Sequence, residues 1–158
     1  MTLLLLLAVA CDFRPMYGDN NQIRTEMAAV EIALITDRTG QLLRNELLDR
    51  LTPTGMANKP RYLLSVHLTE SKKNLAIRRD LTATRANLTI TAQFKLTTWP
   101  TDELLLEGRS RSLNSYNIST FNFATLSAEN DARRRAARAV AEDISTRLAI
   151  YFDAEIAH

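Results

Sequence analysis

Cys11 is the residue whose chemistry is easiest to predict, because it directly follows the apolar run from Met1 to Ala10. A secretory signal combines an apolar segment with small residues at its cleavage site, and Ala8-Val9-Ala10-Cys11 is similar to a bacterial lipobox. Cleavage before Cys11 would let its sulfur carry diacylglycerol and its amine carry a further acyl chain, and stable anchoring needs more than one chain. We therefore expect residues 1–10 to be a lipoprotein signal peptide and Cys11 to be lipidated. A short first strand with an incidental cysteine is the alternative.

A basic segment between two predicted strands is the second candidate for chemistry. It runs from residue 72 to residue 85, and its cations are interleaved with Leu75, Ile77 and Leu81. A projecting hairpin of this composition offers cations for phosphate and apolar surface for acyl chains, since the planar guanidinium fork of arginine can hold a phosphate with two hydrogen bonds. A solvated basic loop is the alternative. The candidate binding residues are Lys72, Lys73, Arg78, Arg79 and Arg85.

A nearly uncharged row of polar side chains is the third candidate. Asn87, Thr89, Thr91 and Gln93 alternate with apolar residues between positions 86 and 96. Solvent-facing strands often carry charges that discourage pairing with other chains. A neutral, hydrogen-bonding row therefore favours contact with a partner, although the β-propensity of threonine alone would also explain it.

Catalysis and nucleic-acid binding find little support in the sequence. The two histidines, His67 and His158, belong to no metal-binding spacing, and there is no nucleophile elbow or glycine-rich phosphate loop. We expect no enzyme, no metal and no cofactor. The arginines of residues 133–138 lie within one or two helical turns of acids at positions 129, 131, 142 and 143, which predicts a salt-bridged surface. With 20 basic and 18 acidic residues, the chain is too balanced to favour nucleic acid, and one cysteine excludes an internal disulfide.

Hydrophobic periodicity predicts the elements that position these residues. Alternation predicts strands near residues 30–34, 62–69, 86–96 and 104–113, with an irregular connection over 114–123. Helical spacing from Leu43 to Leu51 predicts one helix, which Thr36 or Asp37 can cap and which Pro53 and Gly55 end, and a second helix that Thr125 or Ser127 can cap. The order β-α-β-β-β-α predicts an α+β two-layer sandwich, with two helices on one face of a four-stranded, mostly antiparallel sheet. This domain would span residues 27–158, after a lipidated tether over residues 11–26.

Several segments together resemble one known family. Cys11-Asp-Phe-Arg-Pro-Met-Tyr-Gly18 is similar to the Cys-Gly-Phe-Arg-Pro-Leu-Tyr-Gly opening of the alphaproteobacterial LptE family of lipopolysaccharide-assembly lipoproteins. Residues 75–85 resemble its central hairpin, and residues 115–118 and 123–138 resemble its C-terminal region. The likeness covers residues 11–158 in order.

The resemblance implies an outer-membrane lipoprotein on the periplasmic side that plugs the LptD β-barrel. Such proteins help the barrel to fold and lipopolysaccharide to reach the cell surface. The neutral row and the hairpin would then lie inside a polar barrel interior. Arg78 falls where the family carries a basic residue near the hairpin tip, proposed to meet lipid A phosphates.

Two alternatives accompany this expectation. Asp12 replaces the glycine that usually follows the lipidated cysteine, and it resembles an inner-membrane retention signal of enterobacterial lipoproteins. The outer membrane is nevertheless the expected location. The alternative function is a stand-alone periplasmic lipid-binding lipoprotein, which would need an apolar cavity between the helices and the sheet.

Overall fold

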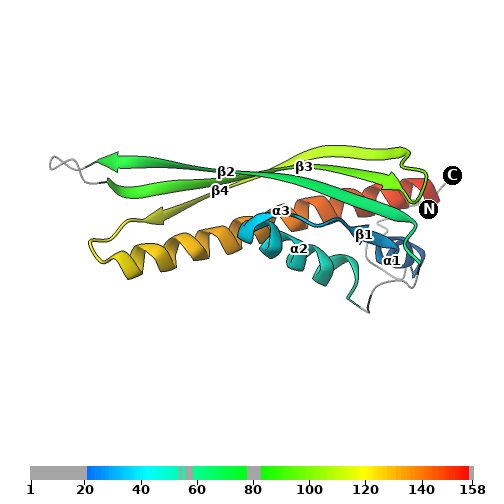
Figure 1. Cartoon of the computed structure of the whole chain (residues 1–158), viewed down its shortest axis with the longest axis horizontal. Coiled ribbons are helices and arrows are strands. Elements are labelled where there is room, and N and C mark those ends of the chain that lie inside the picture. The colour runs from blue at the N-terminus through cyan, green and yellow to red at the C-terminus, as the bar shows by residue number, and fades with distance from the viewer. Residues whose placement is uncertain (1–20, 54, 56–58, 78–82, 157–158) are drawn as a thin grey trace, which may run out of the picture.

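The structure is a computed structural model, and it describes residues 21–53, 55, 59–77 and 83–156. Two layers are visible in Figure 1, a long sheet and a layer of helices beneath it. The elements are α1 (Asn21–Ala28), β1 (Val30–Ile32), α2 (Asp37–Leu51), β2 (Tyr62–Ile77), β3 (Ala83–Thr98), β4 (Leu104–Asn117) and α3 (Asn122–Ile156).

The sheet has the strand order β1-β2-β3-β4. The short strand β1 pairs with β2 in parallel, and β2, β3 and β4 form an antiparallel meander. All three helices lie on one face of this sheet (Figure 1). The predicted fold class, an α+β two-layer sandwich with a mostly antiparallel sheet, is therefore confirmed.

The core lies between α2 and α3 and one face of β3. Because strand side chains alternate between faces, the even-numbered apolar residues of β3 from Ala86 to Leu96 all point toward the helices, and all are buried. The predicted stripe of α3 meets them, since every fourth position from Ala132 to Leu148, and Phe152 after it, is also buried. Gly108 of β4 leaves room for the ring of Phe94, because a Cβ at this position would lie 2.6 Å from Phe94 Cζ.

The structure differs from the predicted elements in one additional helix and in the ends of two others. Helix α1 was not predicted; it begins within the expected tether and buries Ile23 in the core. The connection predicted over residues 114–123 is mostly wrong, since β4 continues to Asn117 by pairing with β3 as far as Arg85. The predicted start of α3 is also wrong, because the helix begins at Asn122. Thr125 instead lies in the first turn, where its hydroxyl donates to the Ser119 carbonyl oxygen and accepts from the Ser119 N–H.

Candidate interaction surfaces of the sheet

The face of the sheet that the helices leave uncovered is the first candidate surface, and we call it the open face. It consists of the odd-numbered side chains of three strands, which point away from the helices. They are Ser65, His67, Thr69, Ser71 and Lys73 of β2, Asn87, Thr89, Thr91, Gln93 and Lys95 of β3, and Glu107, Arg109, Arg111, Leu113 and Ser115 of β4.

The neutral row predicted from the sequence lies along the middle of this face. Thr89 stands opposite Ser71 of β2 and Thr91 opposite Thr69. Asn87 Oδ1 accepts a hydrogen bond from Ser115 Oγ at 2.6 Å. Beside Gln93, the face is hollowed over a volume of about 560 Å³. The open face therefore offers hydrogen-bonding groups over three strands.

Arg109 and Arg111 are residues of the open face that the sequence analysis did not single out. Both are exposed on the edge strand β4, where they stand opposite Gln93 and Thr91. The available signal was the alternation of Arg109 and Arg111 around Ser110, which is buried on the helix side. In the sequence only β3 shows a clear neutral face, so Arg109 and Arg111 could not be assigned to the same surface.

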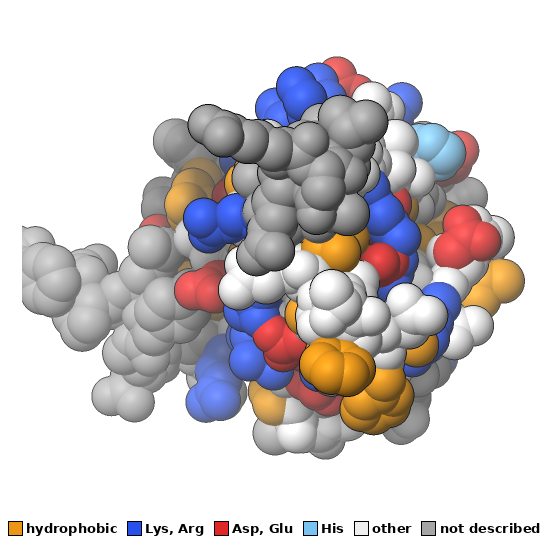
Figure 2. Space-filling view, turned by 90° about the vertical axis from the view of Figure 1, so that its left-hand side faces the viewer, with side chains coloured by type: hydrophobic (Ala, Val, Ile, Leu, Met, Phe, Trp, Pro, Cys, Tyr) orange, Lys and Arg blue, Asp and Glu red, His pale blue; other side chains and the backbone are white. Residues whose placement is uncertain are grey.

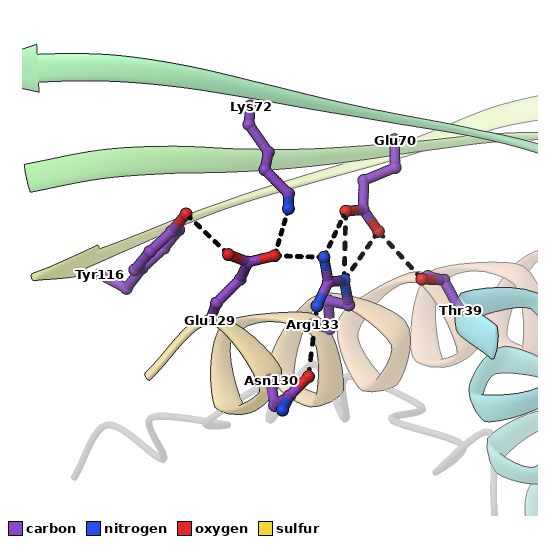
Figure 3. A network of polar contacts seen from close by, with 7 residues as sticks. All are labelled: Thr39, Glu70, Lys72, Tyr116, Glu129, Asn130 and Arg133. Carbon is purple, nitrogen blue, oxygen red and sulfur yellow. Dashed lines mark hydrogen bonds and ion pairs between the residues drawn. The ribbon is translucent and has the colours of Figure 1, made fainter. Parts of the chain in front are cut away.

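The structure separates the cations of the predicted basic segment. Lys73 is exposed on the open face, and Arg85 is exposed near the start of β3. Lys72 points to the opposite side, where its ammonium pairs with Glu129 of α3 (Figure 3). Arg78 and Arg79 lie outside the described residues, as does Cys11.

A network of polar side chains joins the far part of β2 to α3 (Figure 3), and we call it the arm network. Its centre is Arg133, whose Nη2 lies 3.0 Å from Glu70 Oε1 and whose Nε lies 3.1 Å from Glu70 Oε2. Arg133 also pairs with Glu129 of its own helix. The remaining members are Lys72, which pairs with Glu129, Thr39, which donates to Glu70 at 2.9 Å, Tyr116, which donates to Glu129 at 3.3 Å, and Asn130, which accepts from Arg133 at 3.2 Å.

The arm network continues the layer interface where the apolar core ends. On β2, buried Leu64 is followed on the same face by Glu70 and Lys72, which meet the polar side chains of α3. Burial alone would raise the pKa of Glu70 and of Glu129. Hydrogen bonds from Arg133 and Thr39 hold the pKa of Glu70 below its ordinary value, and Lys72 and Arg133 do the same for the pKa of Glu129. Both carboxylates are therefore ionised at neutral pH and neutralise the two cations.

The end of the molecule beyond the arm network exposes apolar side chains. Figure 2 looks at this end and shows hydrophobic side chains gathered along its lower edge. Phe121, which directly precedes α3, and Phe123, in the first turn of α3, are 75% and 83% exposed. These rings contribute little to the core.

The described part of the chain carries neither a metal cluster nor a spanning helix. Within residues 21–53, 55, 59–77 and 83–156, no group of three or more His, Cys, Asp or Glu side chains is placed to hold a metal ion. No helix among these residues is both long enough and apolar enough to cross a membrane.

Solved structures of bacterial lipoproteins share this fold. A crystal structure of a candidate lipoprotein from Caulobacter crescentus CB15 superposes with a TM-score of 0.72 at 23% identity, covering 85% of this chain and 97% of that one. A minor lipoprotein from Acinetobacter baumannii has a TM-score of 0.54 at 18% identity, covering 77% and 90%. Lipoprotein B from Nitrosomonas europaea has a TM-score of 0.55 at 13% identity, covering 82% and 85%.

The family itself is identified from the sequence. No curated protein matches the chain significantly. The model of the LptE family, described as lipopolysaccharide-assembly, matches residues 27–148, which include the sheet and most of α3. This is a family of non-enzymatic envelope lipoproteins, and the resemblance noted in the sequence is confirmed. The chain belongs to the LptE family of lipopolysaccharide-assembly lipoproteins.

Proposed function

We propose that this chain is an outer-membrane lipoprotein that plugs and helps to assemble the LptD β-barrel, and that it takes part in transport of lipopolysaccharide to the cell surface. The observation that carries this proposal is the open face, a polar surface three strands wide that the helices leave uncovered. The proposed role in lipopolysaccharide transport is based on family membership, since the family is one of lipopolysaccharide assembly.

The chemistry of the open face suits the lumen of a barrel. Lumen walls of outer-membrane barrels are polar, because their strands turn apolar side chains to the lipid and polar ones inward. The middle of the open face presents hydroxyl and amide groups, such as those of Thr89, Thr91 and Gln93, which can both donate and accept hydrogen bonds. This neutral middle row can satisfy a polar wall without burying unpaired charge.

Contact with lipopolysaccharide is assigned to the basic segment of residues 72–85. Lys73 and Arg85 are exposed and available to phosphate groups. Among the described cations of the segment, Lys72 is the least available, since its ammonium already pairs with Glu129. Arg78 and Arg79 complete the assignment from the sequence.

Anchoring is assigned to lipidated Cys11 at the periplasmic face of the outer membrane. The tether would begin at this cysteine, and the described domain follows from residue 21. Retention in the inner membrane is the alternative that Asp12 raises.

The alternative function, a stand-alone lipid carrier, would need an apolar cavity between the layers. Leu88 of β3 and Ile144 and Leu148 of α3 belong to one core cluster, and their side chains have no exposed area. Close packing at the centre of the layer interface favours a plug over a carrier.

Co-purification tests the proposal. The chain with a C-terminal tag is expressed in its own membranes, solubilised in detergent and purified, and both the recovered proteins and the mass of the modified N-terminal peptide are determined. We expect a large β-barrel to be recovered with the chain and the Cys11 peptide to carry acyl chains. Cys11→Ala is the control for anchoring and should leave the domain folded but unlipidated. Recovery of lipidated chain without any barrel would contradict the plug function.

Lipopolysaccharide binding by the hairpin is tested separately. Arg78→Glu should weaken binding of lipopolysaccharide without unfolding the domain, since it replaces a cation for phosphate with an anion. Arg134→Glu, on the helix layer, is the matched control. Unchanged binding by Arg78→Glu at moderate salt would refute the assignment of lipopolysaccharide binding to the hairpin.

A further inference from the structure

We infer that Arg109 and Arg111 form a docking site for carboxylate groups on a β-structured protein surface. This inference rests on the proposed function: it states the chemistry that the barrel wall must present to the β4 edge of the open face. The pair is defined by two exposed guanidinium groups on one edge strand.

The register of the sheet sets the spacing of the pair. Arg109 stands opposite Gln93 and Arg111 opposite Thr91, so the two arginines occupy successive positions on the same face of β4. Side chains two residues apart on a strand are roughly 7 Å apart. Because β4 is the edge strand, both guanidinium groups can reach beyond the sheet as well as away from it.

The charge of the pair is not balanced within the described residues. Neither arginine forms an ion pair with another described residue, and Glu107, the acidic neighbour of Arg109 on β4, already has its Oε2 3.9 Å from Lys95 Nζ. The arginines of α3 behave differently. Arg134 pairs with Asp131 at 3.5 Å and Arg147 with Asp143 at 3.0 Å, so the helix compensates these charges itself. The charges of Arg109 and Arg111 on β4 are therefore available to acidic groups of a partner.

The flat arrangement of the pair favours carboxylates over a phosphate group. Two arginines that bind one phosphate converge on it, whereas the backbone positions of these two are separated by the strand period, beside Gln93 and Thr91, which carry no charge that would draw them together. A facing strand presents side chains at the same period, so two of its carboxylates can each meet one guanidinium in a bidentate pair. Arginine is also enriched in protein interfaces, and complementary charge fixes the orientation of docking partners.

Charge reversal tests the inference in the full, lipidated chain. The test variant is Arg109→Glu with Arg111→Glu, and the measured quantity is the amount of barrel recovered per chain. The control, Arg134→Glu with Arg138→Glu, makes the same change in net charge at exposed positions of the helix layer. We expect barrel recovery to fall about tenfold in the test variant and to stay within about twofold in the control. Recovery of the wild-type complex should also fall as salt rises above about 0.15 M.

The outcomes separate this inference from the proposed function. If the wild-type chain recovers no barrel, the plug function fails. If the wild type and the test variant recover the barrel equally, the function stands and the docking site is refuted. Loss of lipopolysaccharide binding with unchanged barrel recovery would also refute it, because the pair would then bind phosphate. Should the charge-reversal variant not fold, Arg109→Gln with Arg111→Gln decides, with an expected loss of about threefold.

Discussion

Replacing Arg133 with methionine should destabilise the domain more than the replacement of an exposed charged residue usually does. The side chain of Arg133 is 15% exposed and makes three hydrogen bonds to Glu70, besides its pair with Glu129. Methionine keeps the length of the side chain but removes its charge. Glu70 and Glu129, whose side chains are 25% and 15% exposed, would then share Lys72 as their remaining cation in the arm network.

The size of the effect follows from the burial of these groups. Breaking a fully buried ion pair costs about 3–5 kcal/mol, and an exposed pair is worth about 0–1 kcal/mol. The arm network lies between these limits and nearer the buried one, so we expect the free energy of unfolding to fall by about 2–3 kcal/mol. Arg134→Met is the matched control: Arg134 is 56% exposed and pairs with Asp131 at 3.5 Å, so the loss should stay below about 0.5 kcal/mol.

Urea denaturation followed by circular dichroism gives the free energy of unfolding of each variant. Hydrogen exchange then locates the effect. Loss of Arg133 should speed exchange of the amides around Glu70 and Lys72 more than those of the core part of β3, because the arm network holds this part of β2 to α3. Equal destabilisation by the two variants, or uniform exchange changes, would refute the role given to Arg133.

Three further perturbations follow from the structure. Gly108→Val should destabilise the domain by about 1–3 kcal/mol in urea denaturation, because its Cβ would lie 2.6 Å from buried Phe94; unchanged stability would contradict this packing. The pKa values of Glu70 and Glu129 are lowered by folding, so their contribution is present above the unfolded value of 4.5 and is lost as pH falls through the folded values. The stability gap between wild type and Glu129→Gln should therefore stay constant from pH 7 to about pH 5 and narrow as the pH falls below 4.5, and a gap that does not narrow would be inconsistent with ionised carboxylates. Phe123→Ser should change stability by less than about 0.5 kcal/mol in the same assay, since the ring is 83% exposed.

Periodicity predicted the layers because burial of one face of a strand or helix requires apolar residues at a regular spacing in the sequence. The alternation from Ala86 to Leu96 and the four-residue stripe of α3 each identify a buried face without reference to the rest of the chain. The core and the fold class therefore followed from local patterns.

Element ends and the arm network did not follow from such patterns. β2 runs on from Leu68 through polar Glu70 and Lys72, where ladder pairing with β3 continues although apolar alternation has ceased. Helix α1 depends on distant partners, since Glu26 accepts a hydrogen bond from Tyr62 at 2.9 Å and Ile23 enters the core. The partnership of Lys72 with Glu129 spans 57 residues, a contact that a single sequence does not reveal.

The open face was predicted only in part for the same reason. Its middle row could be identified on β3, whose two faces differ sharply in polarity. Arg109 and Arg111 joined that row only once the register of β3 and β4 was known. Neighbouring strands contribute to one surface, and the pairing that aligns them is a property of the fold.

Photocrosslinking from Thr91 tests the central claim most directly, because this side chain lies at the middle of the open face, between β2 and β4. A crosslinking amino acid at position 91 of the lipidated chain is irradiated in intact cells, and the adduct is identified by mass spectrometry. We expect a crosslink to the wall of a large outer-membrane β-barrel. A chain that is lipidated and folded but gives no barrel crosslink from this position would contradict it.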